Sequence, residues 1–510
     1  MLFRSVMPLL TKYAIDNFIV AKTTAGLPIF ALVYFCIIVF QALNVRLFIL
    51  NAGKIETHLA YHIRKIGFKR LQELSFSYYD TSSVGWLMAR MTSDVTKLSE
   101  IISWGLIDMV WALVMMAGFI GVMLYNNVRL TIICMSVVPI LFLIGIFFQK
   151  KILKSYRVVR KLNSRLTADF SEEVSGAKTT KTLVREEENL KEFKIDAGKM
   201  RNSSVKAAVF SALFLPIVIS MGSLGVGFVL WLGGKSIIEG TLSYGTFVMF
   251  IAYTVQFFDP VSRLAGTIAE LQNAQASAER IIDLIETKPD IWDKEDVISK
   301  YGDLFNSKME NWEEIHGDIE FKDVCFTYKN GEKVFDNFNL KVNKGETIAL
   351  VGETGSGKST LVNLLCRFYE PSSGAILIDG IDYRKRSLLW LQSNIGYVLQ
   401  SPHLFSGTIR DNIIYGKLDA SIPEIENAAR LVNAHSFISK LEKGYDTQVG
   451  EGGGNLSTGE KQLISFARAI LADPALFVLD EATSSIDTET ERMIQNAIEK
   501  VLKEIGRAHV

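Results

Sequence analysis

The chain has 510 residues, enough for more than one domain, and 49% of them are hydrophobic although an ordinary 22% are charged. Its 55 basic and 55 acidic residues cancel, and no basic stripe interleaves with aromatic residues, so nothing in the composition indicates a nucleic-acid partner. The cysteines show no C-x-x-C spacing, which argues against a zinc site or a disulfide framework: Cys36, Cys134, Cys325 and Cys366.

Apolar residues concentrate before residue 260, in stretches near the roughly 20 residues that a helix needs to cross a bilayer. A shorter stretch, 7–20, stands for a first span whose beginning we expect to be missing. We therefore predict an all-α membrane bundle of the six-span type, its first span partial. Several stretches carry a charge or an amide, so a helical bundle buried in a large soluble protein is the alternative. The full-length candidates are 28–50, 101–124, 130–148, 209–232 and 244–258.

Positive charge is divided unequally between the connections. The long loops 51–100 and 149–207 hold seven and fifteen Lys and Arg residues, whereas 20–27, 125–129 and 233–243 hold one each. Cytoplasmic loops carry the excess of such residues. The long loops, and everything after the last span, are thus predicted to be cytoplasmic, in a multi-pass protein of the cytoplasmic membrane.

Ionisable residues in or near the spans are expensive in lipid and are candidates to line a cavity: Arg46, Asp108 and Asp259. Methionines and aromatic residues there would suit an adaptable apolar pocket, namely Trp111, Met115, Met116 and Phe214. Placement near an interface or a water-filled vestibule for structural reasons is the favoured explanation of the ionisable residues, and ordinary helix packing is the favoured explanation of the others.

Residues 284–316 are charged and poor in Gly and Ser, and they are interpreted as a partly helical linker. This linker is longer than the join requires, and its extra length has no functional explanation in the sequence. The resulting domains are 1–283 for the membrane part with its long cytoplasmic loops, 284–316 for the linker, and 317–510 for a second domain.

The second domain contains a phosphate-binding motif, because GETGSGKST at 352–360 matches G-x-x-x-x-G-K-[ST]. Its glycines turn backbone N–H groups toward phosphate oxygens, Lys358 reaches the outer phosphates, and the Ser359 hydroxyl binds Mg²⁺. The flanks predict a buried parallel strand at 347–351 and a helix from 361. The residues predicted to hold ATP are Gly352, Thr354, Gly355, Ser356, Gly357, Lys358, Ser359 and Thr360.

A second apolar run, 476–479, ends in Asp480 and Glu481. Beside a phosphate loop, Asp480 can hold Mg²⁺ through water, and Glu481 can act as the general base for the attacking water. Without the loop, these residues would equally be a solvated strand end.

These motifs, with LSTGE at 456–460, resemble the nucleotide-binding domain of ATP-binding-cassette (ABC) proteins over residues 317–504. LSTGE is similar to the family signature LSGGQ but differs at Thr458 and Glu460. By this resemblance Tyr328 stacks on adenine and Gln400 senses the metal and the transport domain. Residues 71–95 and 172–187 are similar to the intracellular loops of the type I exporter class, whose tips seat in grooves on the cassettes.

The resemblance implies an α/β P-loop ATPase domain of the ABC type that uses ATP and Mg²⁺. Two cassettes then meet head to tail, and Ser457 and Gly459 of one complete the site that contains Lys358 of the other. The family also expects a strand and a histidine about thirty residues after the Glu481-type carboxylate. His509 comes too early for that role. We therefore expect the cassette to be truncated at its C-terminus.

The predicted function is that of an ATP-driven exporter half-subunit whose substrate is a drug, a lipid or a peptide. An intact Glu481 beside an irregular signature favours a heterodimer with a second half-transporter, although a homodimer stays open. A nucleotide-gated channel or regulator on the same architecture, and a soluble ATPase with a buried helical domain, are the alternatives.

Overall fold

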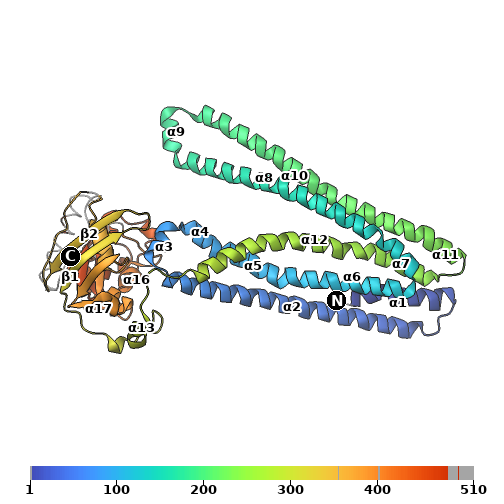
Figure 1. Cartoon of the computed structure of the whole chain (residues 1–510), viewed down its shortest axis with the longest axis horizontal. Coiled ribbons are helices and arrows are strands. Elements are labelled where there is room, and N and C mark those ends of the chain that lie inside the picture. The colour runs from blue at the N-terminus through green and yellow to red at the C-terminus, as the bar shows by residue number, and fades with distance from the viewer. Residues whose placement is uncertain (1–2, 354, 400–401, 480–491, 493–494, 496–510) are drawn as a thin grey trace. The chain divides into compact units, whose positions relative to one another are not determined.

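The computed structural model describes residues 3–353, 355–399, 402–479, 492 and 495. The chain forms two compact units, each built from two separate stretches (Figure 1). Met1–Phe68 and Met88–Glu286 form the first, here called the helical unit. Lys69–Leu87 and Thr287–Val510 form the second, the sheet unit, which therefore includes a short piece of the N-terminal half.

Long helices dominate the helical unit, and π-helical turns interrupt or extend several of them. The α-helices are α1 (Phe3–Ala14), α2 (Leu27–Glu73), α4 (Val84–Ala89), α5 (Val95–Glu100), α6 (Leu106–Asn126), α7 (Val128–Met135), α8 (Val137–Ser175), α9 (Ala177–Leu183), α10 (Glu186–Phe228), α11 (Gly234–Ile238) and α12 (Tyr244–Glu286). The end of α2 and most of α4 belong to the short stretch Lys69–Leu87 of the sheet unit. The π-helical turns are η1 (Ile15–Val20), η2 (Arg90–Asp94), η3 (Ile101–Gly105) and η4 (Val229–Gly233).

Within the described residues, four helical runs are long and apolar enough to cross a membrane: Leu27–Glu73, Val84–Asn126, Val128–Ser175 and Glu186–Ile238. Each contains one of the predicted spans 28–50, 101–124, 130–148 and 209–232. The two other predicted segments are helical but do not meet the same criteria of length and composition: 7–20 lies in α1 and η1, and 244–258 in α12. The apolar window of α2 has no buried residue, as expected for a helix that faces lipid or another chain.

The core of the helical unit lies between α6 and α12, where Met115, Phe119 and Met123 meet Phe250 and Tyr253. Glycines let α10 approach α12 closely, since a Cβ at Gly222 would lie 3.0 Å from the Phe258 ring. α8 and α10 run antiparallel and are joined through α9 (Figure 1).

A buried ion pair fastens α12 to the start of α5. Asp94, 4% exposed, accepts hydrogen bonds of 2.8 and 2.6 Å from Arg280 and one of 2.8 Å from Ser277. The hydrogen bond from Arg280 holds the pKa of Asp94 below its usual value although burial opposes it. Arg90 pairs with Asp283 at 3.3 Å one turn away.

The sheet unit contains an antiparallel sheet of order β2-β1-β3-β4 and a parallel pair, β5 and β6, among its described residues. The strands are β1 (Ile319–Thr327), β2 (Lys333–Val342), β3 (Ser373–Ile378), β4 (Ile381–Asp382), β5 (Ile395–Val398) and β6 (Leu476–Leu479). The helices are α3 (Phe76–Thr81), α13 (Glu295–Tyr301), α14 (Lys358–Leu365), α15 (Leu388–Ser393), α16 (Ile409–Ile414), α17 (Ile422–Leu431), α18 (His435–Ile438) and α19 (Thr458–Leu471), with 3₁₀ turns η5 (Met309–Asn311), η6 (Tyr383–Lys385), η7 (Gly444–Asp446) and η8 (Glu451–Gly453).

Two apolar cores support this unit. One packs α14 between the two sheets, with Ile319, Leu364 and Trp390 fully buried. The other packs α19 against α16 and α17, through residues such as Ile413, Ala429 and Ile464.

The prediction of a buried strand at 347–351 is wrong in one respect. Ile348 and Leu350 do pack on the core, but the segment is not a strand and Val351 is 93% exposed. A strand requires a hydrogen-bonded neighbour, and the described strands pair elsewhere: β1 with β2 and β3, and β5 with β6. Within 347–351 the described structure gives a β-bridge to Thr347 alone, so the segment keeps the alternating burial of an extended chain without forming a strand.

Candidate nucleotide-binding site

The predicted phosphate loop ends at the N-terminus of α14, with Gly357 as its N-cap. Gly355 and Gly357 have φ of +86° and +92°, which favours glycine. At Gly357 space matters as well, because a Cβ would lie 2.8 Å from Val334 Cγ1 and 3.1 Å from the Phe335 ring. Because the loop ends at the helix N-terminus, the first backbone N–H groups of α14 point toward the loop. Helix N-termini bind phosphate groups in this arrangement in other proteins.

Lys358 folds back over this loop. Its Nζ donates to the carbonyl oxygens of Gly352 at 2.6 Å and Glu353 at 3.0 Å. The neighbouring residues differ in exposure: the Ser359 side chain is exposed, whereas Thr360 is buried. The ammonium and the Ser359 hydroxyl thus lie on the accessible side of the loop, where phosphate oxygens can compete for them.

Tyr328, predicted to stack on adenine, is tied to the phosphate loop. Its hydroxyl lies 2.9 Å from Thr360 Oγ1, and its ring packs edge-on against Tyr369 with centroids 5.4 Å apart. The Tyr369 hydroxyl donates to Asp80, which comes from the short N-terminal stretch of this unit. Burial, with the nearby Asp80 carboxylate, raises the pKa of Tyr369 above its usual value.

The predicted strand before Asp480 exists as β6. β5 and β6 run parallel in register, with Val398 opposite Leu479, so both strands end at the same edge. Gln400 and Asp480, the predicted metal-site residues, follow these ends in sequence and lie outside the described residues, as do Glu481 and Thr354. Their predicted roles stay predictions.

The irregular signature forms a capping box at the N-terminus of α19. The Glu460 N–H donates to Ser457 Oγ at 3.3 Å, while the Glu460 carboxylate accepts from the Ser457 N–H at 2.8 Å and from its hydroxyl at 2.9 Å. Ser457 remains exposed and Gly459 is buried. Glu460, which departs from the family pattern, therefore hydrogen-bonds through its carboxylate to Ser457, the serine predicted to bind phosphate.

The tip of the first long loop lies in the sheet unit. In α3, the Phe76 ring packs on Phe368 with centroids 4.2 Å apart, three residues after α14 ends. The Ser77 hydroxyl donates to Asp290, and Asp290 also accepts from Lys329, the residue after Tyr328. The tip thus contacts the segments that carry the phosphate loop and Tyr328. By contrast, α9 at the tip of the second long loop has no buried residue.

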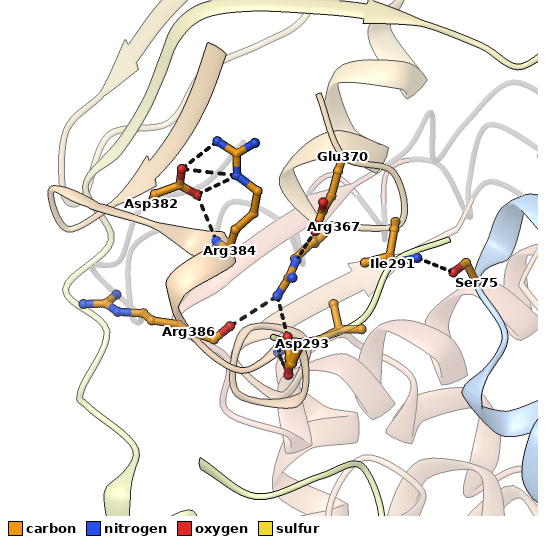
Figure 2. A network of polar contacts seen from close by, with 9 residues as sticks. Ser75, Ile291, Asp293, Arg367, Glu370, Asp382, Arg384 and Arg386 are labelled. Atoms are coloured by element: carbon orange, nitrogen blue, oxygen red, sulfur yellow. Dashed lines mark hydrogen bonds and ion pairs between the residues drawn. The ribbon is translucent and has the colours of Figure 1, made fainter. Parts of the chain in front are cut away.

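The linker has a structural role that the sequence did not reveal (Figure 2). The Ile291 N–H donates to Ser75 Oγ at 3.0 Å, which holds the loop tip. On the other side, Asp293 accepts from the Arg367 guanidinium at 2.8 Å. Arg367, whose side chain is 1% exposed, also bonds Glu370 and the Arg386 carbonyl. The linker therefore joins the loop tip to the residues that follow α14.

The fold and the loop geometry define a class: a P-loop ATPase that carries long apolar helices. The comparisons then give the family. Residues 2–261 match the family described as "ABC transporter transmembrane region", and residues 335–484 match the one described as "ABC transporter". The chain belongs to the ABC transporters.

Similar proteins include the uncharacterised ABC transporter ATP-binding protein YfiC of Bacillus subtilis, 36% identical over all of this chain and 82% of that protein. An ATP-dependent lipid A-core flippase of Desulfotalea psychrophila is 32% identical over 97% of this chain and 84% of the flippase. A putative multidrug export ATP-binding/permease protein, YgaD of Bacillus subtilis, is 33% identical over 98% of this chain and 85% of that protein.

The family and its relatives make this chain an ABC exporter half-transporter with an ATPase domain, in agreement with the sequence prediction. It is a multi-pass membrane protein whose ATPase domain is cytoplasmic, and members of its family work as dimers. ATP is thus its nucleotide.

Sequence reasoning missed Asp290, Asp293 and Arg367. Asp290 and Asp293 lie in a charged linker, where an acidic residue cannot be distinguished by sequence from a solvent-exposed one. The pairing of Asp293 with Arg367 was also hidden because the two are 74 positions apart in the chain. The arginine had one local signal: Arg367 has a positive φ of 54° directly after the C-cap of α14, a place where glycine or asparagine is usual.

Proposed function

We propose that this half-transporter exports an amphiphilic or apolar solute by closing two cassettes around ATP. The observation that carries the proposal is the place of α3, which packs in one unit with the phosphate loop through Phe76 and Phe368. Closure of the cassettes would pull directly on the membrane helices that α3 joins. Two of the similar proteins are named as a lipid flippase and a putative multidrug exporter, which supports export over ion conduction.

In this proposal the residues have divided roles. Lys358 leaves the carbonyls of Gly352 and Glu353 for the outer phosphates. Ser359, with Gln400 and Asp480, holds Mg²⁺, and Glu481 is the base that takes a proton from the attacking water. Phosphoryl transfer depends chiefly on such positioning and charge stabilisation.

The partner is proposed to be a different half-transporter. The Glu460 carboxylate bonds Ser457, the residue that would face the γ-phosphate bound to the partner chain. Two negative groups would then compete for the N-terminus of α19, which weakens one of the two ATP sites. A homodimer would carry this defect in both sites, whereas a partner with a regular signature keeps one site fully active.

The test uses the full-length gene, expressed with and without candidate partner half-transporters and reconstituted in vesicles. ATP-dependent accumulation of a solute, lost in Lys358→Ala and kept in Lys440→Ala, is the expected result. Lys440 is an exposed lysine distant in sequence from the loop, so it controls for the loss of charge. Ion flux down its gradient without matching hydrolysis would instead identify a channel. Full activity of this chain alone, as a symmetric dimer, would contradict the heterodimer.

A further inference from the structure

A cavity of about 760 Å³ lies between α8, α10 and α12 of the helical unit. Its lining changes character along the helices. Gly145 and Phe214 belong to predicted spans, whereas Arg157 and Arg160 lie about 14 to 18 Å beyond the end of the span at 130–148, at 1.5 Å per residue. The cavity therefore runs from the depth of the bilayer to its cytoplasmic side.

The bilayer end of the cavity is apolar and aromatic. Phe214 packs against Phe148 with ring centroids 6.1 Å apart, and Ile152 and Leu153 continue the apolar lining along α8. No charged residue lines this end among the described residues. An alkyl or aromatic group could lie here without leaving a buried charge unpaired.

The cytoplasmic end is cationic. Arg157 and Arg160 line it together with the amides of Asn163, Gln272 and Asn273, and no acidic residue appears in its described lining. Neither arginine forms an ion pair among the described residues, whereas the nearby Arg165 is paired with Asp196 at 2.9 Å. Guanidinium groups bind phosphate and carboxylate through paired N–H donors.

A neighbouring cavity differs in its charge. It has a volume of about 630 Å³, shares Arg160 and Asn273 with the first, and is lined by both signs, Lys97 and Arg280 beside Glu100 and Glu270. The described lining of the first cavity, by contrast, has Arg157 and Arg160 without an acidic residue. An anionic group is therefore assigned to the first cavity.

We infer that this cavity takes an amphiphile with an anionic head, a phosphate or a carboxylate, and an apolar tail. The inference rests on the proposed export function and names the substrate class for it. The head lies at Arg157 and Arg160, and the tail extends toward Phe214. A cationic amphiphile would meet two like charges and no acid at the same place, so it is excluded as the preferred substrate.

The test compares probes that share a tail or a head, on the assembled full-length transporter in phosphatidylcholine vesicles. Dodecyl phosphate is expected to bind and to stimulate ATP hydrolysis, whereas dodecyltrimethylammonium and inorganic phosphate are not. Replacing both arginines, Arg157→Gln with Arg160→Gln, should raise the half-maximal dodecyl phosphate concentration roughly tenfold, the loss of charge-assisted hydrogen bonds. Lys161→Gln, an exposed charge on α8 outside the lining, should leave it unchanged.

A second experiment, with phosphatidylglycerol added to the vesicles, tests whether the anionic amphiphile is a membrane lipid or a soluble molecule. Competition with dodecyl phosphate identifies a membrane lipid as the occupant, and its absence identifies a soluble amphiphile. Equal stimulation by the cationic probe, or equal effects of the arginine and Lys161 variants, would overturn the inference. Transport of some other solute would leave the export function standing, whereas absence of ATP hydrolysis and transport under every condition would refute that function itself.

Discussion

Gly357 shows how much of the site depends on single backbone positions. It combines a φ of +92° with a side-chain space already filled by Val334 and Phe335. Gly331, in the turn between β1 and β2, has nearly the same φ of +91° but open space around it. The two glycines thus separate the effect of backbone strain from that of crowding at the phosphate loop.

Gly357→Ala is expected to weaken ATP binding by more than about tenfold, because the loop must shift away from the phosphate geometry. Gly331→Ala carries the same strain and should cost about 1 kcal/mol of stability with ATP affinity unchanged. Fluorescent ATP-analogue binding to the purified full-length protein measures both. Equal loss of affinity in the two variants would show that the crowding is irrelevant.

Glu460 is the residue at which this signature departs most in charge from its family. Glu460→Gln keeps a side chain that can still cap Ser457 but removes the negative charge. ATP affinity of the composite site that includes this signature should then rise by roughly tenfold. Nucleotide titration of the assembled dimer measures it, with Glu424→Gln, the same capping change on α17, as the control. An unchanged affinity would mean that the carboxylate does not face nucleotide.

At the scale of elements, the linker is fastened by a buried charge. Asp293→Ala would leave the Arg367 guanidinium, 1% exposed, with one carboxylate fewer, and we expect the sheet unit to lose about 3 kcal/mol of stability. Asp382→Ala removes a similar but local pair, Arg384 with Asp382, that is more exposed, and should cost about 1 kcal/mol. Thermal unfolding of the full-length protein gives the comparison; equal shifts would mean that burial of Arg367 is unimportant.

Asp290 links α3 to Lys329 in a pH-dependent way. Burial acts to raise the pKa of Asp290, but hydrogen bonds from Lys329 and Ser77 outweigh it and lower the pKa. The ionised Asp290 carboxylate therefore stabilises the fold fully when the pH is above its unfolded-state pKa of about 3.9. This stabilisation is lost as the pH falls through the lower pKa of the folded state.

Between about pH 5 and 8 Asp290 stays ionised, so its titration should not change the protection of the α3 amides against hydrogen exchange. Asp290→Asn should accelerate the exchange at neutral pH, because the charge that Lys329 pairs with is gone. Asp296→Asn, an acidic residue in the first turn of α13, is the control. Slow exchange in the Asp290 variant would show that the aromatic contact of Phe76 suffices.

The sequence predicted elements whose signals are local. The run 476–479 became β6, four spans became long helices, and the glycine-lysine loop sits at the start of α14. The prediction of a strand at 347–351 failed because a short, mostly apolar run does not show which neighbouring segment would pair with it. The hydrogen bonds that Asp290 and Asp293 accept were not predicted, because they join segments that are far apart in the chain. Sequence periodicity carries no information about such contacts.

For the whole molecule, the distribution of positive charge predicts which connections face outward. Tyr125, 92% exposed at the end of α6, lies in a connection poor in positive charge, whereas Lys178 lies in α9. In a cysteine-free background, Tyr125→Cys should react with an impermeant maleimide in intact cells. Lys178→Cys should react only after the cells are broken. The reverse pattern would invert the topology.

The sheet unit is discontinuous in sequence, and this has a consequence for its synthesis. Lys69–Leu87 leaves the ribosome about 200 residues before Thr287 does, which at 5–20 residues per second is a delay of about 10 to 40 s. Phe76 lacks its partner Phe368 throughout that interval and during synthesis of the further 81 residues that separate Thr287 from Phe368. In nascent chains, the aromatic segment around Phe76 should therefore be exposed and available for binding by cytosolic chaperones until translation is well into the second half of the gene.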